Sequence, residues 1–297
     1  MLRMVVTGRC DGQVARSFIE RPSEAFEIVL LGRPQLDLAG SAESIQAAIE
    51  AERPDVIVSA AAYTQVDKAE SEPDLVFAIN AQGPRAIARA AGRLGVPLIH
   101  LSTDYVFDGT KPSAYVEEDE TNPTGVYGAS KLAGERAVLA ECENSAVLRT
   151  AWVYGPFGAN FVKTMLRLAG DRDEVGVVAD QFGNPSNSDD IVQAILKVAA
   201  NLQSGSESKH RGIFHMAGSG EASWAEFAEA IFAISADLGG PTAAVRRIAT
   251  TDYPTAAKRP ANSRLDSGKL ERVHGVVLPS WQSSLKTTVN RLLQSGG

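Results

Sequence analysis

The sequence predicts an α/β fold, a doubly wound parallel sheet with a smaller C-terminal lobe. In its first half, short runs of β-branched and apolar residues alternate with longer helical stretches, as in parallel strands joined by crossover helices. The runs are apolar along nearly their whole length, which is typical of strands covered on both faces. Because this regularity weakens after residue 151, we divide the chain into a sheet domain, residues 1–151, and residues 152–297, mainly the lobe and partly interleaved with the sheet.

The elements follow from these runs in chain order. Strands are predicted at Arg3–Thr7, Glu27–Leu31, Val56–Ser59, Leu98–Ser102 and Ala146–Thr150. Helices are predicted at Gln13–Glu20, Ser44–Glu52, Glu72–Leu94 and Gly128–Cys142. In the second half we expect helices at Phe161–Ala169, Asp190–Asn201, Trp224–Leu238 and Trp281–Leu293, strands at Val175–Val178 and Gly212–Met216, and a loop at Gln181–Ser188.

Composition excludes several classes of protein. The net charge is −7, and the Lys and Arg residues are scattered rather than gathered in a stripe, so no nucleic-acid partner is expected. Cys10 and Cys142 belong to no C-x-x-C pair, which argues against a disulfide framework and a zinc site. No apolar run is long enough for a membrane span and no signal-peptide core follows Met1. We therefore expect a cytoplasmic protein with no membrane association and no bound metal.

A glycine-rich turn follows the first strand and opens the first helix. It reads Thr7-Gly8-Arg9-Cys10-Asp11-Gly12-Gln13-Val14-Ala15, a G-x-x-x-G-x-x-A spacing. Small residues there let the backbone approach a pyrophosphate at the helix N-terminus, where free N–H groups favour negative charge. An ordinary strand–helix turn would look the same in isolation. Its position after the N-terminal strand favours a Rossmann-like dinucleotide site.

The ends of the second and third strands carry two further features of such a site. After the second strand, Arg33 stands where an acidic residue often binds the adenosine ribose, so a 2′-phosphate is acceptable and NADPH is at least as plausible a cofactor as NADH. A solvated loop arginine is the alternative. After the third strand, Ala60-Ala61-Ala62-Tyr63 offers small residues against which a flat cofactor can lie.

Tyr127 and Lys131 form the strongest catalytic candidate. At positions i and i+4 they share one face of a predicted helix, so the ammonium is expected to stabilise the phenolate and lower the pKa of the phenol. Thr103, at the end of the fourth strand, supplies a hydroxyl for a substrate carbonyl oxygen. Chance produces Y-x-x-x-K pairs, but these three residues lie at the expected strand and helix ends.

These motifs resemble the short-chain dehydrogenase/reductase superfamily, and within it the dTDP-4-dehydrorhamnose reductase family. The resemblance runs nearly from end to end. It includes residues 54–58, 60–70, 102–109, 126–135, 149–154, 160–161, 180–183 with Pro185, and 259–260 with 262–263. It implies reduction of a C4 ketone on a dTDP-linked sugar by NADPH or NADH, with no metal in the chemistry.

The resemblance also implies roles for individual residues. Tyr127 is similar to the proton donor to the sugar O4, Lys131 to its partner that also holds the nicotinamide ribose, and Thr103 to the third member. The implied cofactor contacts are Gly8, Asp11, Gly12, Gln13, Val14, Arg33, Asp37, Leu38, Ala60, Ala61, Ala62 and Tyr63, together with Tyr127 and Lys131. The implied substrate contacts are Thr103, Asp104, Trp152, Asn160 and Gln181.

Two departures from the family and three alternatives stay open. The glycine turn has an extra residue, with Ala15 at the usual last glycine. Some relatives dimerise through magnesium held by glutamates, where this chain has Ser17, Asp189 and Arg291, so we expect a monomer, leave a weak dimer open, and do not expect a magnesium-bridged dimer. The alternatives are another nucleotide-sugar reductase, an epimerase or dehydratase, and a non-catalytic regulatory subunit of the methionine adenosyltransferase type.

Overall fold

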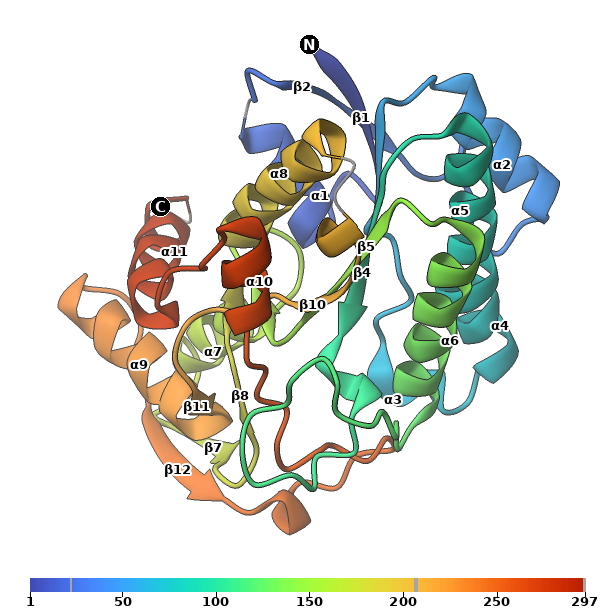
Figure 1. The fold of residues 1–297 in the computed structure, drawn as a ribbon. Coiled ribbons are helices and arrows are strands. Elements are labelled where there is room, and N and C mark those ends of the chain that lie inside the picture. Colours follow the sequence, from blue (N-terminus) through green and yellow to red (C-terminus); the bar gives the residue numbers. More distant parts are fainter. Residues whose placement is uncertain (22, 206–207, 296–297) are drawn as a thin grey trace.

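The computed structural model describes residues 1–21, 23–205 and 208–295, and its central layer is a six-stranded parallel sheet. The strand order is β10-β5-β4-β3-β1-β2 (Figure 1). The strands are β1 (Leu2–Thr7), β2 (Phe26–Leu31), β3 (Val56–Ser59), β4 (Leu98–Thr103), β5 (Ser145–Thr150) and β10 (Gly212–His215). The order reverses at β1, between β2 and β3, which is where a doubly wound sheet binds ligands at its carboxyl edge. The predicted fold class is confirmed.

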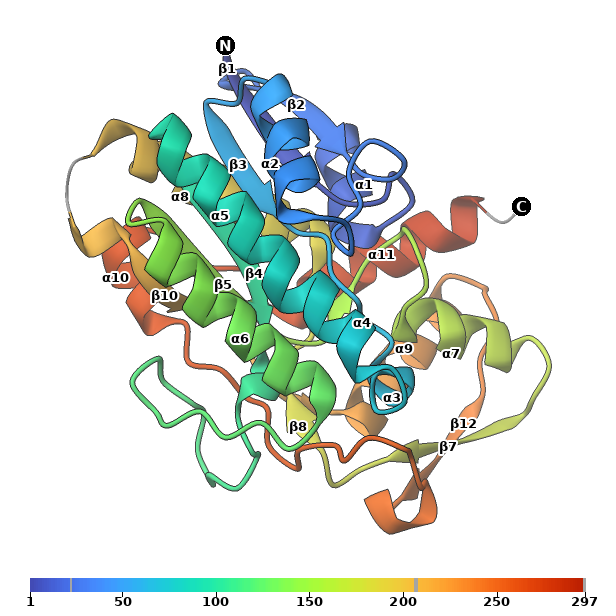
Figure 2. The same ribbon diagram turned by 90° about the vertical axis from the view of Figure 1, so that its right-hand side faces the viewer.

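Helices cover both faces of the sheet because its strands are apolar on both sides. Met4 and Val6 point to one buried cluster while Val5 points to the other, as the two-residue period of a strand requires. The first face is covered by α1 (Gln13–Glu20), α8 (Ser188–Ser204) and α10 (Gly268–His274). The second is covered by α2 (Ala42–Ala51), α5 (Gly83–Leu94) and α6 (Val126–Glu141), which lie side by side in Figure 2.

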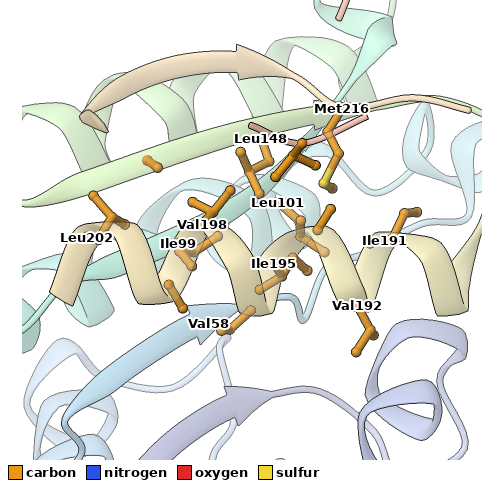
Figure 3. Close-up of a cluster of buried hydrophobic side chains, with 14 of the residues drawn as sticks. Val58, Ile99, Leu101, Leu148, Ile191, Val192, Ile195, Val198, Leu202 and Met216 are labelled. Carbon is orange, nitrogen blue, oxygen red and sulfur yellow. The ribbon is translucent and has the colours of Figure 1, made fainter. Parts of the chain in front are cut away.

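Helix α8 shows how the first face is sealed. Its residues Ile191, Ile195, Val198 and Leu202 recur at helical spacing and are at most 3% exposed. They pack onto strand residues of β3, β4 and β5, namely Val58, Ile99, Leu101 and Leu148 (Figure 3). This helix follows residue 151 in the chain but belongs to the sheet layer, as does β10.

The lobe forms beside the carboxyl edge of the sheet around its own apolar cluster. Three helices enclose that cluster, α7 (Phe161–Ala169), α9 (Trp224–Asp237) and α11 (Trp281–Ser295). Strands β7 (Glu174–Val178) and β12 (Ala244–Ile248) pair in parallel along its outer side (Figure 1). Two short pairs complete it, β6 (Val153–Tyr154) with β9 (Ser186–Asn187) and β8 (Phe182–Gly183) with β11 (Ala222–Ser223).

Several elements differ from the sequence predictions. The single helix expected at Glu72–Leu94 is α4 (Pro73–Phe77), a π-helical turn η1 (Ala78–Gln82) and α5. The π turn widens the helix where buried Asn80 bonds two other segments. The loop expected at Gln181–Ser188 contains β8 and β9. Helix α3 (Val66–Ala69), helix α10 and strand β12 were not predicted, and the 3₁₀ turns are η2 (Asp104–Val106), η3 (Ser208–His210) and η4 (Thr250–Asp252).

Features expected from composition can be checked in the described part of the chain. Cys10 is exposed, Cys142 is buried, and neither is bonded to the other. Within residues 1–21, 23–205 and 208–295, no helix combines the length and the apolar character needed to cross a membrane. Among the same residues no three or more His, Cys, Asp or Glu side chains gather in a way that could hold a metal ion.

Gly134 gives a direct test of how closely α6 must approach the π turn. A Cβ atom at this position would lie 2.2 Å from the carbonyl oxygen of Asn80. We predict that Gly134→Ala destabilises the protein by about 1–3 kcal/mol, because the added methyl forces the two elements apart. Urea unfolding measures the change in the free energy of unfolding. The matched control is Gly170→Ala, whose Cβ meets its nearest neighbour at 3.3 Å. Equal stability of the two variants would contradict the prediction.

Candidate active site

A cavity of about 790 Å³ opens at the carboxyl ends of β1, β2 and β3. Eight of the predicted cofactor residues line it: Gly8, Asp11, Arg33, Asp37, Leu38, Ala61, Ala62 and Tyr63. The turns after β1 and β2 approach so closely that a Cβ on Gly32 would lie 2.3 Å from the Gly8 carbonyl oxygen. At these glycines the backbone faces the cavity without a side chain, and the turn that leads into α1 forms part of the lining. This arrangement fits a dinucleotide.

The other six predicted cofactor residues lie outside the lining of this cavity: Gly12, Gln13, Val14, Ala60, Tyr127 and Lys131. Gly12 caps α1, and Ala60 donates its N–H to the Thr7 hydroxyl at 3.1 Å. Val14 packs against the apolar cluster on the first face of the sheet. Gln13 reaches the lobe, because its amide donates to the Val153 carbonyl and accepts from Asn160.

Two arginine–aspartate pairs stand at the entrance. Arg33 donates to Asp37 at 2.9 Å, and Arg9 donates to Asp11 at 2.6 and 2.8 Å. Both arginines are exposed and line the cavity. The N–H of Ala39 and the Arg33 guanidinium hold the pKa of Asp37 below its usual range. The entrance therefore offers two guanidinium groups to an anion, each already balanced by a carboxylate.

Asn80 connects the cavity to α6, a link that the sequence analysis missed. Its amide accepts from the Tyr63 N–H at 2.8 Å and donates to the Tyr63 carbonyl and to the Ser130 hydroxyl. Ser130 donates in turn to the Tyr127 carbonyl at 2.7 Å. These hydrogen bonds connect the segment after β3, which lines the cavity, to α6, the helix that carries Tyr127.

Thr103, Asp104 and Tyr127 meet where β4 ends and α6 begins. The Thr103 hydroxyl donates to Asp104 at 2.8 Å and accepts from the Tyr105 N–H. Gly128 permits the close approach, since a Cβ there would lie 2.1 Å from the Tyr105 carbonyl oxygen. The Tyr105 ring meets the Tyr127 ring edge-on at 5.8 Å. The end of β4 and the start of α6 thus bring Thr103 close to Tyr127, as the predicted shared role of the two residues requires.

The electrostatics of Tyr127 differ from the sequence-based expectation. Burial raises the pKa of the phenol to about 12, while the nearby Thr103 hydroxyl acts in the opposite direction. Lys131 is buried and donates to the Leu101 carbonyl oxygen at 2.6 Å. Burial lowers the pKa of its ammonium to about 8, and Glu135 opposes that shift. The predicted lowering of the phenol pKa is therefore wrong for this arrangement, because desolvation dominates and the ammonium donates to a backbone carbonyl.

The predicted substrate residues fall into two groups. Asp104 and Trp152 both lie near Ser263, which accepts from the Trp152 indole at 3.2 Å and whose hydroxyl partly opposes the rise that burial causes in the pKa of Asp104. Trp152 has a left-handed backbone, with φ at 47°, and its ring stacks on Trp224 at 3.5 Å. A non-glycine residue in this region costs energy and is held by its surroundings.

Asn160 and Gln181 are engaged in other contacts. Asn160 caps α7 by accepting from the Lys163 N–H, while its amide nitrogen donates to Gly155, Phe157 and Gln13. The Gln181 amide donates to the Thr250 hydroxyl at 3.0 Å. Both side chains are used within the chain, so their assignment to the substrate stays a prediction.

Arg259 and Asp67 form another contact that the sequence analysis did not single out. Arg259 donates to Asp67 at 2.6 Å, and the Ala257 N–H donates to the same carboxylate. The Arg259 guanidinium lies 6.0 Å from the centre of the Tyr105 ring. Since 192 residues separate the pair, no local pattern could have indicated it. It ties the late segment of the lobe to α3 across the site.

The chain matches one family model and many curated proteins over most of its length. The family model is the RmlD substrate binding domain, which covers residues 2–294. The dTDP-4-dehydrorhamnose reductase of Sinorhizobium fredii (strain NBRC 101917 / NGR234) is 51% identical over 295 residues, 99% of this chain and 99% of that protein.

Solved structures agree with this match. A crystal structure of a dTDP-4-dehydrorhamnose reductase from Clostridium acetobutylicum is similar with a TM-score of 0.91 and 35% identity, covering 98% of this chain and 100% of that one. The reductase of Bacillus anthracis, solved in complex with NADP, has a TM-score of 0.89 and 35% identity, covering 98% and 99%.

Asp104 gives the site a testable pH signature. Burial raises its pKa from 3.8 to about 6, so folding favours the neutral carboxyl. Its contribution to stability is present below pH 4 and is lost as pH rises to about 6, at a cost of at most about 3 kcal/mol. We predict that Asp104→Asn becomes progressively more stable than the wild type over this window, measured by denaturant unfolding at pH 4 to 8.

The control for this measurement is Asp108, whose pKa is shifted in the opposite direction. Hydrogen bonds from the Thr110 backbone and hydroxyl lower the pKa of Asp108 to about 2. Asp108→Asn should therefore lose stability by an amount that stays constant between pH 5 and 8. A constant difference for Asp104→Asn as well would contradict the prediction.

Proposed function

The chain belongs to the RmlD substrate binding domain family, and on that premise we propose that it is a dTDP-4-dehydrorhamnose reductase. The proposed reaction is the NAD(P)H-dependent reduction of the C4 ketone of dTDP-4-dehydro-β-L-rhamnose to dTDP-L-rhamnose. The observation that carries the proposal is the meeting of Thr103 and Tyr127 beside buried Lys131, next to a cavity that fits a dinucleotide.

When bound, the nicotinamide supplies a hydride to C4 of the sugar. The residues of the chain manage the oxygen and its proton. As the C4–O double bond opens, O4 gains negative charge, and Tyr127 donates its phenolic proton to it. A pKa of about 12 keeps this proton on the phenol at neutral pH until a more basic alkoxide develops. Thr103 positions O4 through its hydroxyl.

Lys131 and Asp104 complete the proposed chemistry. With a pKa of about 8, Lys131 is mainly an ammonium at neutral pH, so it offers a positive charge near the phenolate left after proton transfer. Asp104, with a pKa of about 6, is mainly a carboxylate there and can accept hydrogen bonds from sugar hydroxyls. Trp152, whose indole nitrogen donates to Ser263 near Asp104, is the proposed apolar contact of the sugar.

We further propose that residues 152–297 supply most of the sugar-nucleotide surface and that the chain acts as a monomer in the cytosol. At the three positions where the magnesium-bridged relatives carry glutamates, Ser17 bonds Ser188 in the interior, Asp189 lies 3.5 Å from Arg21, and Arg291 pairs with Glu20. These contacts support the absence of a magnesium-bridged dimer. Two unbonded cysteines are consistent with a reducing compartment.

The proposed activity is tested by following nicotinamide absorbance with enzymatically made dTDP-4-dehydro-L-rhamnose. We expect oxidation of NADPH by the wild type and none by Tyr127→Phe, because the variant lacks the proton that O4 requires. NADPH binding, measured by fluorescence titration, should be nearly unchanged. The control is Tyr253→Phe, since that side chain is 60% exposed. Retained turnover in Tyr127→Phe would remove it as the proton donor, and an inactive wild type would refute the activity itself.

Arg33 is the proposed determinant for NADPH. We predict that Arg33→Ala raises KM for NADPH about tenfold and leaves KM for NADH nearly unchanged, because only NADPH carries the 2′-phosphate that a guanidinium binds. Steady-state kinetics with both cofactors measure the ratio. Arg93→Ala is the control, an exposed arginine paired with Glu50 away from the cavity. An equal change with both cofactors would assign Arg33 a different role.

A further inference from the structure

A buried ion pair lies directly behind the proposed catalytic residues. Glu135 of α6 and Arg149 of β5 have side chains that are 1% and 2% exposed. Arg149 donates to both carboxylate oxygens, at 2.9 and 2.7 Å. Desolvating two charges offsets most of what their attraction gains, so such a pair is weak evidence for stability alone. Its place in the fold indicates another role.

The carboxylate of Glu135 joins three elements that carry the site. The Ser102 hydroxyl donates to it at 2.5 Å. Ser102 lies opposite Arg149 in the pairing of β4 with β5, and Thr103 is the next residue of the strand. One carboxylate therefore fixes α6 to both strands beside the residue whose hydroxyl meets Tyr127.

The same carboxylate is aligned with the catalytic face of the helix. Tyr127, Lys131 and Glu135 are spaced at i, i+4 and i+8, so they lie in one row along α6. Leu101, which accepts from Lys131, and Ser102, which donates to Glu135, are consecutive in β4. The two contacts fix the position of the helix along the strand, and Tyr127 lies one turn beyond them.

The charges around Lys131 give Glu135 an electrostatic part as well. Apart from burial, Glu135 is the group that acts on the Lys131 ammonium, and it favours the charged form. The titratable groups on the elements that contact α6 are His100 of β4, Asp104 and Tyr105 of η2, Arg149 of β5, Asp67 and Lys68 of α3, Asp74 of α4, and Arg85, Arg89 and Arg93 of α5. Burial lowers the pKa of His100, and the Lys131 charge acts in the same direction.

We propose that Glu135 is a positioning residue for the reduction, one that fixes α6 against β4 and supplies the counter-charge of Lys131. Arg149 orients the carboxylate by its two hydrogen bonds. This inference rests on the proposed function, because Lys131 must be charged when Tyr127 releases its proton.

The experiment is the pH profile of kcat/KM for Glu135→Gln. Loss of the carboxylate charge removes the group that favours the Lys131 ammonium, so the basic limb of the profile should move to lower pH. We expect a shift of about one pH unit, equal to about a tenfold loss at the alkaline end after normalisation at pH 6.5. Glu135→Asp keeps the charge and should retain the wild-type limb.

A matched control lies on the same helix. Glu141 also pairs with arginines, at 2.9 Å from Arg89 and 3.8 Å from Arg85, but at the far end of α6 from Tyr127. Glu141→Gln should leave the profile unchanged. If Glu135→Gln is folded and loses activity by the same factor at every pH, or not at all, the proposal is overturned.

Two further measurements keep the test decisive. If Glu135→Gln does not fold, the double variant Glu135→Met with Arg149→Met removes both buried charges. The basic limb of its kcat/KM profile should still move to lower pH. The second measurement is NMR of the cofactor-free protein labelled with ¹³C-lysine, in which Lys131→Arg identifies the Lys131 signal. The pKa of Lys131 should be lower in Glu135→Gln than in the wild type. An inactive wild type would refute the proposed function, whereas an active wild type with unshifted variants would refute only the role of Glu135.

Discussion

The close docking of α6 onto the end of β4 is the constraint on which the site depends. Gly128 and Gly134 have no side chain because carbonyl oxygens of Tyr105 and Asn80 occupy the space that a Cβ would need. Between them, Lys131 bonds the strand backbone. The steric fit at the two glycines and the polar contact between them both hold the helix at the same position. The helix therefore has one position along the strand, and in that position Thr103 and Tyr127 meet.

Much of the sheet could be predicted because its strands are buried on both faces and their apolar runs are continuous. The bounds of β3, α1 and α7 agree with the predictions, and β1, β2, β4 and β5 begin or end within one residue of them. The π turn at Ala78–Gln82 could not be predicted, since Asn80 adopts it to reach Tyr63 and Ser130. Strand β12 likewise depends on its partner β7.

The site was predictable where its chemistry is local in the chain. Tyr127 and Lys131 could be found because helical spacing places them on one face, and the glycine turn because it follows a strand. The Glu135–Arg149 pair joins a helix to a strand, and its burial depends on tertiary packing that the sequence does not state. The pKa of Tyr127 was wrongly expected to fall, because the spacing gives the partner but not the degree of desolvation.

The edge strand β10 has a consequence for how the molecule can be made and divided. It pairs with β5 although the first lobe segments lie between them in the chain, and Leu270 and Leu278 close the same core. The chain must therefore be synthesised as far as residue 278 before the first face of the sheet is fully covered. Long-range closure of this kind slows folding and leaves apolar surface exposed meanwhile. For the same reason the first 151 residues are not an exchangeable module, and chimaeras between relatives should keep β10, α8 and α10 from the parent that supplies the sheet.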